Sequence, residues 1–172
     1  MLGAPILNMH MHSGVYFTLP DKRVYLFEKY SDYYTEKITQ FSEMCNREIG
    51  NGNLKICIEN TDGFAPFAQR GIERLLKSPR FGLTLDVGHM HGADYIDAPF
   101  CAAHMDRLTH MHLHDAVGRK NHLPLGEGEL DWREKIALAG THNARAVVEV
   151  KTPSALRDSV KRLCLAGYVA AP

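Results

Sequence analysis

Four acidic or imidazole side chains occur where apolar segments end, and together they could bind a metal ion. They are Glu59, Asp86, His112 and Glu149. Burying a carboxylate is costly unless it meets a cation or hydrogen-bond donors. Three carboxylates and one imidazole suit a single Mn²⁺, Co²⁺, Zn²⁺ or Mg²⁺ ion. Glu59 and Glu149 would flank a substrate carbonyl polarised by that ion. We therefore expect each to be both a metal ligand and a catalytic residue that transfers a proton.

Histidine is the second unusual feature of the sequence. The chain has ten, most of which lie between His89 and His122. Neutral imidazole is the commonest metal ligand and a proton carrier near neutral pH. Within residues 109–115 three histidines alternate with apolar residues, so one face of a strand would carry all three. The alternative is an exposed edge strand, but the apolar residues between the histidines would still need a core on the other face.

The elements that would position these residues form a regular α/β pattern. Five apolar segments predict strands, each followed by an amphipathic helix. The strands are expected at Pro5–His12, Leu54–Glu59, Gly82–Gly88, Thr109–Asp115 and Ala144–Lys151. The helices are expected within Phe27–Ile49, Pro66–Lys77, Ala98–Leu108, Asp131–Gly140 and Thr152–Gly167. We see no hairpin signal, so the connections imply parallel strands with right-handed crossovers.

A partial (βα) barrel accounts for this pattern better than an open dinucleotide-binding sheet. The first strand is followed by His12-Ser13-Gly14-Val15, which lacks the glycines that cradle a pyrophosphate. Polar residues at the carboxyl ends of the strands match the active-site face of a barrel. Five units and 172 residues fall short of a closed (βα)8 barrel, and we expect the C-terminal five-eighths of one, as a single domain over residues 1–172.

Composition narrows the class of protein. Twenty Lys and Arg residues balance twenty Asp and Glu, which disfavours a protein whose main task is to bind nucleic acid or an anionic membrane. Four cysteines without a CxxC pair favour neither a disulfide framework nor a thiolate zinc site. No window reaches about 18 consecutive apolar residues, so we expect a cytoplasmic protein without a membrane span.

Two segments near the middle of the chain carry a family resemblance. The run His112-Leu113-His114-Asp115 and the segment HLPLGEGELDW at 122–132 resemble the xylose isomerase-like TIM-barrel superfamily. That superfamily includes sugar isomerases, sugar epimerases and endonuclease IV-type AP endonucleases. The pairs Glu59-Asn60 and Val148-Glu149 and the spacing Asp86-x-x-His89 occur in the same order as in the family.

The resemblance implies roles for individual residues. It makes Glu59, Asp86, His112 and Glu149 the metal-binding quartet. It further implies substrate contacts, or ligands of a second metal, for His89, His122 and one of His10 and His12, between which the sequence does not decide. Lys120 departs from the endonuclease pattern, which has an aspartate two residues before the histidine matching His122.

Three functions are compatible with these residues. We favour a divalent-metal-dependent isomerase or epimerase acting on a small sugar or sugar phosphate. The alternatives are phosphodiester cleavage at abasic DNA sites and a non-catalytic, truncated barrel fragment. Because both outer strands of a five-stranded parallel sheet have an unpaired edge, we also expect a homo-oligomer.

Overall fold

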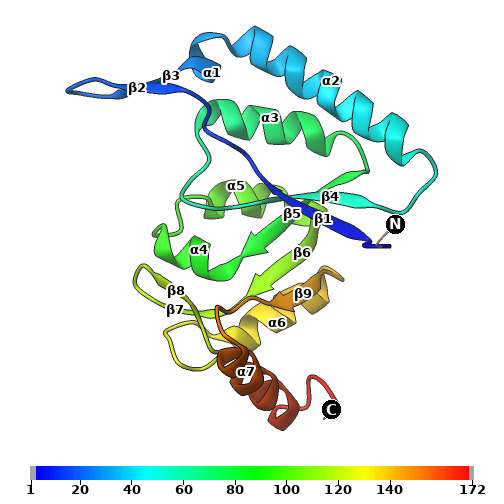
Figure 1. Ribbon diagram of the computed structural model, residues 1–172, viewed down its shortest axis with the longest axis vertical. Coiled ribbons are helices and arrows are strands. Elements are labelled where there is room, and N and C mark those ends of the chain that lie inside the picture. Colours follow the sequence, from blue (N-terminus) through cyan, green and yellow to red (C-terminus); the bar gives the residue numbers. More distant parts are fainter. Residues whose placement is uncertain (1–2, 171–172) are drawn as a thin grey trace.

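A curled sheet of five parallel strands forms the centre of the molecule (Figure 1). The computed structural model describes residues 3–170. The strands of this sheet are β1 (Ile6–His10), β4 (Lys55–Glu59), β5 (Phe81–Asp86), β6 (Leu108–Leu113) and β9 (Arg145–Val148). They lie side by side in the order β1-β4-β5-β6-β9, and every neighbouring pair is parallel. The prediction of a partial (βα) barrel with five parallel strands is confirmed.

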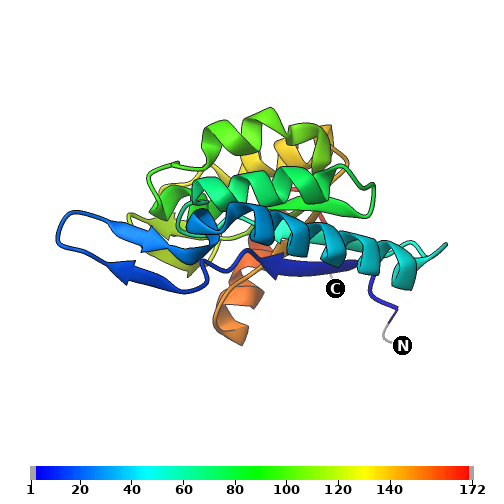
Figure 2. The same ribbon diagram turned by 90° about the horizontal axis from the view of Figure 1, so that it is seen from above.

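Helices connect the strands and cover the outside of the half-barrel. They are α1 (Leu26–Lys29), α2 (Ser31–Ile49), α3 (Pro66–Leu76), α4 (Val87–Gly92), α5 (Ala98–Ala103), the 3₁₀ helix η1 (Met105–Arg107), α6 (Trp132–Thr141) and α7 (Pro153–Leu165). Figure 1 shows them running from α2 at the top to α7 at the bottom, and Figure 2 shows α2 and α3 on the same side of β1. Within residues 3–170, no helix is both long and apolar enough to cross a membrane.

The core lies between the sheet and these helices. Ile56 and Ile58 of β4 pack with Leu75 of α3 in one apolar cluster. Met111 and Leu113 of β6 belong to a second cluster with residues of α6 and α7, so the apolar residues between the histidines do find a core. Each large aliphatic side chain buried in this way stabilises the fold by about 1.5–3 kcal/mol. Since side chains alternate along a strand, the polar residues of these strands face the opposite side of the sheet.

Four of the five strands of the central sheet end earlier than their sequences suggested, and only β4 ends at the predicted residue, Glu59. The segment predicted as Gly82–Gly88 leaves the sheet at Asp86, because the Asp86 carboxylate accepts the backbone N–H of His89 at 2.7 Å and caps helix α4. The segment predicted as Ala144–Lys151 ends at Val148, so Glu149 follows its strand. The strands predicted to end at His12 and at Asp115 likewise end two residues early, at His10 and Leu113. The long helix predicted within Phe27–Ile49 is divided at Tyr30.

Two antiparallel hairpins contradict the expectation that the chain contains none. They are formed by β2 (Tyr16–Thr18) with β3 (Arg23–Tyr25), and by β7 (Asp115–Val117) with β8 (Lys120–Leu123). Neither uses an Asn-Gly or Asp-Gly turn. The first is closed by the N–H of Leu19, which donates to the Lys22 carbonyl at 2.8 Å, and the second turns at Gly118 with φ +51°. They follow β1 and β6, and so arise at the carboxyl edge of the sheet.

Candidate metal centre

The carboxyl ends of four strands bring the predicted quartet together. Glu59 and Asp86 are the last residues of β4 and β5, His112 is the last residue but one of β6, and Glu149 follows β9. One ligand atom from each lies within 4.8 Å of the other three. Parallel strands bring their carboxyl ends to the same edge, which explains why residues far apart in the sequence converge here.

The ring nitrogen Nδ1 of His112 lies among three carboxylates. It is 2.7 Å from Glu149 Oε2, 3.3 Å from Glu59 Oε1 and 3.5 Å from Asp86 Oδ2. Despite these short distances, His112 Nδ1 and Glu149 Oε2 are buried atoms without a hydrogen-bond partner among the described residues. Buried polar atoms usually have partners. Donor atoms that approach one another without forming hydrogen bonds fit a shared cation, and the set of three oxygens and one nitrogen suits a divalent ion.

Electrostatics at the site also favour a cation. Burial alone would raise the pKa of Glu59, but the imidazoles of His112 and His89 outweigh it and hold the pKa well below its usual range. Burial would likewise raise the pKa of Asp86, but His112 and His114 outweigh it and lower that pKa. Burial lowers the pKa of His112, yet Asp86 and Glu59 raise it to about 10. A proton on His112 thus balances part of the negative charge that a divalent cation would neutralise more fully.

Two of the predicted substrate histidines lie against Glu59. His10 Nε2 is 2.9 Å from Glu59 Oε2, which also accepts from the Asn8 amide. His89 Nδ1 is 3.3 Å from Glu59 Oε1. By contrast, His12 is exposed, and its Nδ1 accepts the backbone N–H of Gly14 at 2.9 Å. Between the two candidates on the first strand, the structure brings His10 to the quartet and leaves His12 outside it.

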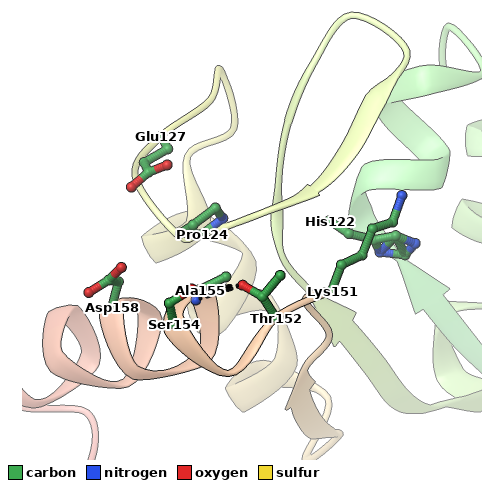
Figure 3. Close-up of a pocket in the computed structure, with 8 residues that line it drawn as sticks. All are labelled: His122, Pro124, Glu127, Lys151, Thr152, Ser154, Ala155 and Asp158. Carbon is green, nitrogen blue, oxygen red and sulfur yellow. Dashed lines mark hydrogen bonds between the residues drawn. The ribbon is translucent and has the colours of Figure 1, made fainter.

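His122 is separated from the quartet by the rings of His114 and His89. Its ring centroid is 4.3 Å from that of His114 and 5.4 Å from that of His89. Burial is the main cause that lowers the pKa of His122 to about 4. His122 also borders a cavity of about 340 Å³, where Figure 3 shows it beside Lys151 and shows Glu127 and Asp158 at the other end.

A larger cavity lies on another side of His89. It has a volume of about 910 Å³ and is bordered by His89. Further lining residues come from the two hairpins and from the loops after β4 and α4, among them Arg23, Asp62, Arg119 and Asn121. A small polar molecule therefore has room beside His89, which in turn contacts Glu59.

Asp115 has a structural role that its sequence pattern did not reveal. Its side chain is fully buried, and Oδ1 accepts the N–H groups of Ala116 and Leu130 while Oδ2 accepts that of Gly126. At Gly128 a Cβ atom would lie 2.3 Å from both the Ala116 carbonyl oxygen and Asp115 Oδ1. The glycine-rich part of segment 122–132 is thus shaped by contact with Asp115. In the sequence, the one indication that Asp115 matters to the site is its position three residues after His112.

Fold and site together define an α/β half-barrel with a candidate divalent-metal site at the carboxyl ends of its strands. The chain belongs to the xylose isomerase-like TIM-barrel family, whose model matches residues 1–164. The resemblance drawn from segments 112–115 and 122–132 is confirmed. Comparison with curated protein sequences gave no significant match.

Several solved structures share the fold. A D-tagatose 3-epimerase-like protein matches with a TM-score of 0.62 and 21% identity, covering 95% of this chain and 61% of that one. The zinc-bound IOLI protein gives a TM-score of 0.65 and 14% identity, covering 99% and 66%. A xylose isomerase domain protein from Planctomyces limnophilus gives 0.61 and 16%, covering 96% and 58%. The chain therefore spans about three fifths of the length of these structures.

Proposed function

We propose that Glu59, Asp86, His112 and Glu149 bind one divalent cation, of Mn, Co, Zn or Mg, and that the chain isomerises or epimerises a small sugar or sugar phosphate. The observation that carries this proposal is the approach of three carboxylates to His112 Nδ1 without hydrogen bonds. The fold of a D-tagatose 3-epimerase-like protein and that of a zinc-bound protein support it.

The two glutamates are suited to move a proton at the carbon beside a substrate carbonyl. A divalent ion bound there supplies Lewis acidity, which makes that C–H bond more acidic. One carboxylate takes the proton, and the other returns a proton to the resulting enediolate. Glu149, whose side chain is 45% exposed, can reach a substrate, while Glu59 is 3% exposed and held by Asn8 and His10.

The surrounding polar residues would bind the substrate hydroxyl groups. The cavity of about 910 Å³ beside His89 is large enough for a sugar, and Arg119 at its edge could pair with a phosphate. We assign substrate contacts to His89 and His10, which already touch Glu59. His122, which packs against His89 and His114, and the exposed His12 remain predictions for substrate binding.

The endonuclease alternative has less support. That reaction would use a cluster of several metals, and the family pattern places an aspartate two residues before the position of His122. Lys120 stands there, exposed at the start of β8. Within residues 3–170, the quartet is the one group of His, Cys, Asp and Glu side chains found close enough to hold an ion.

Solvent exchange tests the proposed function. The Mn²⁺-loaded protein is incubated in D₂O with a panel of ketoses and ketose phosphates, and NMR follows deuterium incorporation beside the carbonyl. We expect exchange with the wild type and a loss of about 10²–10⁴-fold in Glu149→Gln. The control His142→Ala, at the end of α6, should exchange at the wild-type rate. Exchange that is independent of Mn²⁺, or equal in wild type and Glu149→Gln, would contradict the proposal, as would metal binding without exchange on any substrate.

A further inference from the structure

His114 is a fully buried histidine between β6 and β7 that lies outside the quartet. Its side chain has no exposed surface. Nε2 lies 3.0 Å from Asp86 Oδ1 and 3.2 Å from Asp86 Oδ2, while Nδ1 accepts the backbone N–H of His122 at 2.9 Å. His114 therefore links a candidate ligand on β5 to the hairpin β7–β8.

These contacts select one form of the imidazole ring. A backbone N–H can only donate, so the contact with His122 requires a lone pair on Nδ1 and places the proton on Nε2. The opposite tautomer could donate from Nδ1 to the Asp115 carbonyl at 3.2 Å. It would, however, leave the His122 N–H without an acceptor and turn an Nε2 lone pair toward the Asp86 carboxylate. Unpaired buried polar groups cost more than the single bond gained, so Nε2–H donates to Asp86.

The two oxygens of Asp86 are consequently held unequally, since His114 Nε2 lies nearer to Oδ1, at 3.0 Å, than to Oδ2, at 3.2 Å. Oδ1 accepts from the His89 backbone N–H at 2.7 Å and from His114 Nε2–H at 3.0 Å. Oδ2 points to the quartet, 3.5 Å from His112 Nδ1. A carboxylate held mainly through one oxygen presents the other in a fixed direction, and hydrogen bonds of this type tune metal ligands in proteins.

The backbone around His114 is built to hold this ring in place. A Cβ atom at Gly88 would lie 2.0 Å from His114 Cε1, so the absence of a side chain at Gly88 leaves the space that the imidazole fills. His122 has φ +57°, a left-handed conformation that is unfavourable for residues with a Cβ atom. The hydrogen bond from its N–H to His114 helps to stabilise that conformation.

We propose that His114 is a positioning residue, which fixes the Asp86 carboxylate for metal binding and couples it to the hairpin β7–β8 through the backbone of His122. The consequence for metal affinity rests on the proposed metal site. The tautomer and the link to the hairpin do not, and they can be measured in the metal-free protein.

Nitrogen NMR of the imidazole rings provides the first test. In metal-free protein with ¹⁵N-labelled histidine, we expect His114 to be neutral, with a protonated Nε2 and an unprotonated Nδ1. A proton on Nδ1 would overturn the proposal, whatever the protein does with metals. This measurement needs no variant, so it remains decisive even if substitutions at this buried position impair folding.

Substitution provides the second test. His114→Phe keeps a ring of similar size but removes both hydrogen bonds, whereas the amide of His114→Gln can accept and donate as the imidazole does. In calorimetric titrations with Zn²⁺, we expect the affinity to fall about 10- to 100-fold in His114→Phe and to recover largely in His114→Gln. The matched control is His91→Phe, which loses a 3.0 Å contact with Glu129 in the neighbouring loop but touches no quartet residue.

Amide hydrogen exchange separates positioning from a general loss of structure. In the wild type, Zn²⁺ should slow exchange of the His122 N–H, because ordering of Asp86 is transmitted through His114. The slowing should disappear in His114→Phe and persist in His91→Phe. Wild-type Zn²⁺ affinity in His114→Phe, or equal affinity losses in the His114→Phe and His91→Phe variants, would overturn the proposal.

Discussion

The central strands and the outer strand β9 hold the candidate metal site in different ways. Glu59 and Asp86 end central strands, and their side chains are 3% and 0% exposed. Glu59 is held by Asn8 and His10, and Asp86 by His114 and the His89 backbone. Glu149 follows the outer strand with a side chain that is 45% exposed, and its Oε2 has no hydrogen-bond partner among the described residues.

Because of this difference, we expect the central carboxylates to contribute to the stability of the fold and Glu149 to contribute mainly to metal binding and proton transfer. The central carboxylates belong to the buried hydrogen-bond network, so their loss should weaken both the fold and the site. Glu149 is held by its backbone, whose N–H donates to the Leu113 carbonyl at 3.1 Å. Its side chain is free to serve as a ligand and a proton carrier at little cost to folding. We therefore expect effects on stability to decrease from Asp86 at the centre to Glu149 at the edge.

Removal of Asp86 should have the largest effect. Asp86→Ala leaves His112 and His114 facing a buried gap in place of a carboxylate, and breaking a buried charged network of this kind costs about 3–5 kcal/mol. Urea unfolding of the metal-free protein measures the change, and Zn²⁺ binding should be lost as well. A destabilisation below about 1 kcal/mol would show that the centre does not depend on this carboxylate.

The second-largest effect should be a loss of stability at low pH, caused by protonation of Glu59 and Asp86. The folded-state pKa values of Glu59 and Asp86 lie below their usual range, so the stabilisation they provide is present above about pH 4 and is lost as the pH falls through the folded values. Charged hydrogen bonds of this kind contribute about 1.5–3 kcal/mol. Unfolding free energies of the metal-free protein between about pH 6 and pH 2 test this, and Glu59→Gln should give a shallower profile. Identical profiles would contradict the prediction.

High pH should also destabilise the metal-free protein, because His112 loses its proton. Its folded-state pKa is raised to about 10, so the stabilisation is complete below its unfolded value near about 6.5 and is lost as the pH rises toward 10. In His112→Gln the loss over this interval should be smaller, as unfolding free energies measured across it will show. Zn²⁺ should also reduce the loss in the wild type, because a bound cation replaces the proton.

Gly88 should be less tolerant of alanine than Gly140. Gly88→Ala forces His114 away from Asp86 and should cost about 1–3 kcal/mol, together with Zn²⁺ affinity. Gly140 lies in α6 with nothing within 4 Å of an added Cβ, so Gly140→Ala should stabilise the protein by about 0.5–1 kcal/mol. Thermal unfolding of the two variants compares them, and a stable Gly88→Ala protein with full affinity would contradict the role of this contact.

Substitution of Glu149 should change stability least. Glu149→Gln should alter the free energy of unfolding of the metal-free protein by no more than about 1 kcal/mol, because the side chain is partly exposed and its one close contact among the residues the structure describes is a solvent-screened ion pair with His112. Zn²⁺ affinity should nevertheless fall at least tenfold. A destabilisation comparable to that of Asp86→Ala would erase the difference between centre and edge.

The sequence predicted the sheet and the quartet well because both follow from short-range patterns. Apolar runs located all five strands. Polar residues at or near the ends of four of these runs predicted the four side chains that converge, since parallel strands bring their carboxyl ends to one edge. Strand ends were less accurate. At Asp86 the side chain caps α4, and this local hydrogen bond overrides the β-forming residues that follow.

The hairpins and His114 required the three-dimensional structure. The turns at Pro20 and Gly118 lack the residue pairs that identify hairpins from sequence. The contact of His114 with Asp86 joins residues 28 positions apart, and its meaning depends on a backbone N–H at His122. Periodicity alone groups His114 with His110 and His112, so it indicates a shared face but not a different role.

Diffraction from crystals grown with Mn²⁺, recorded at the manganese absorption edge, tests the central claim most directly. We predict one anomalous peak per chain, about 2.0–2.3 Å from one atom each of Glu59, Asp86, His112 and Glu149. A chain without a peak at this position, or with manganese bound instead by carboxylates of the cavity mouth such as Asp62 and Asp94, would contradict it.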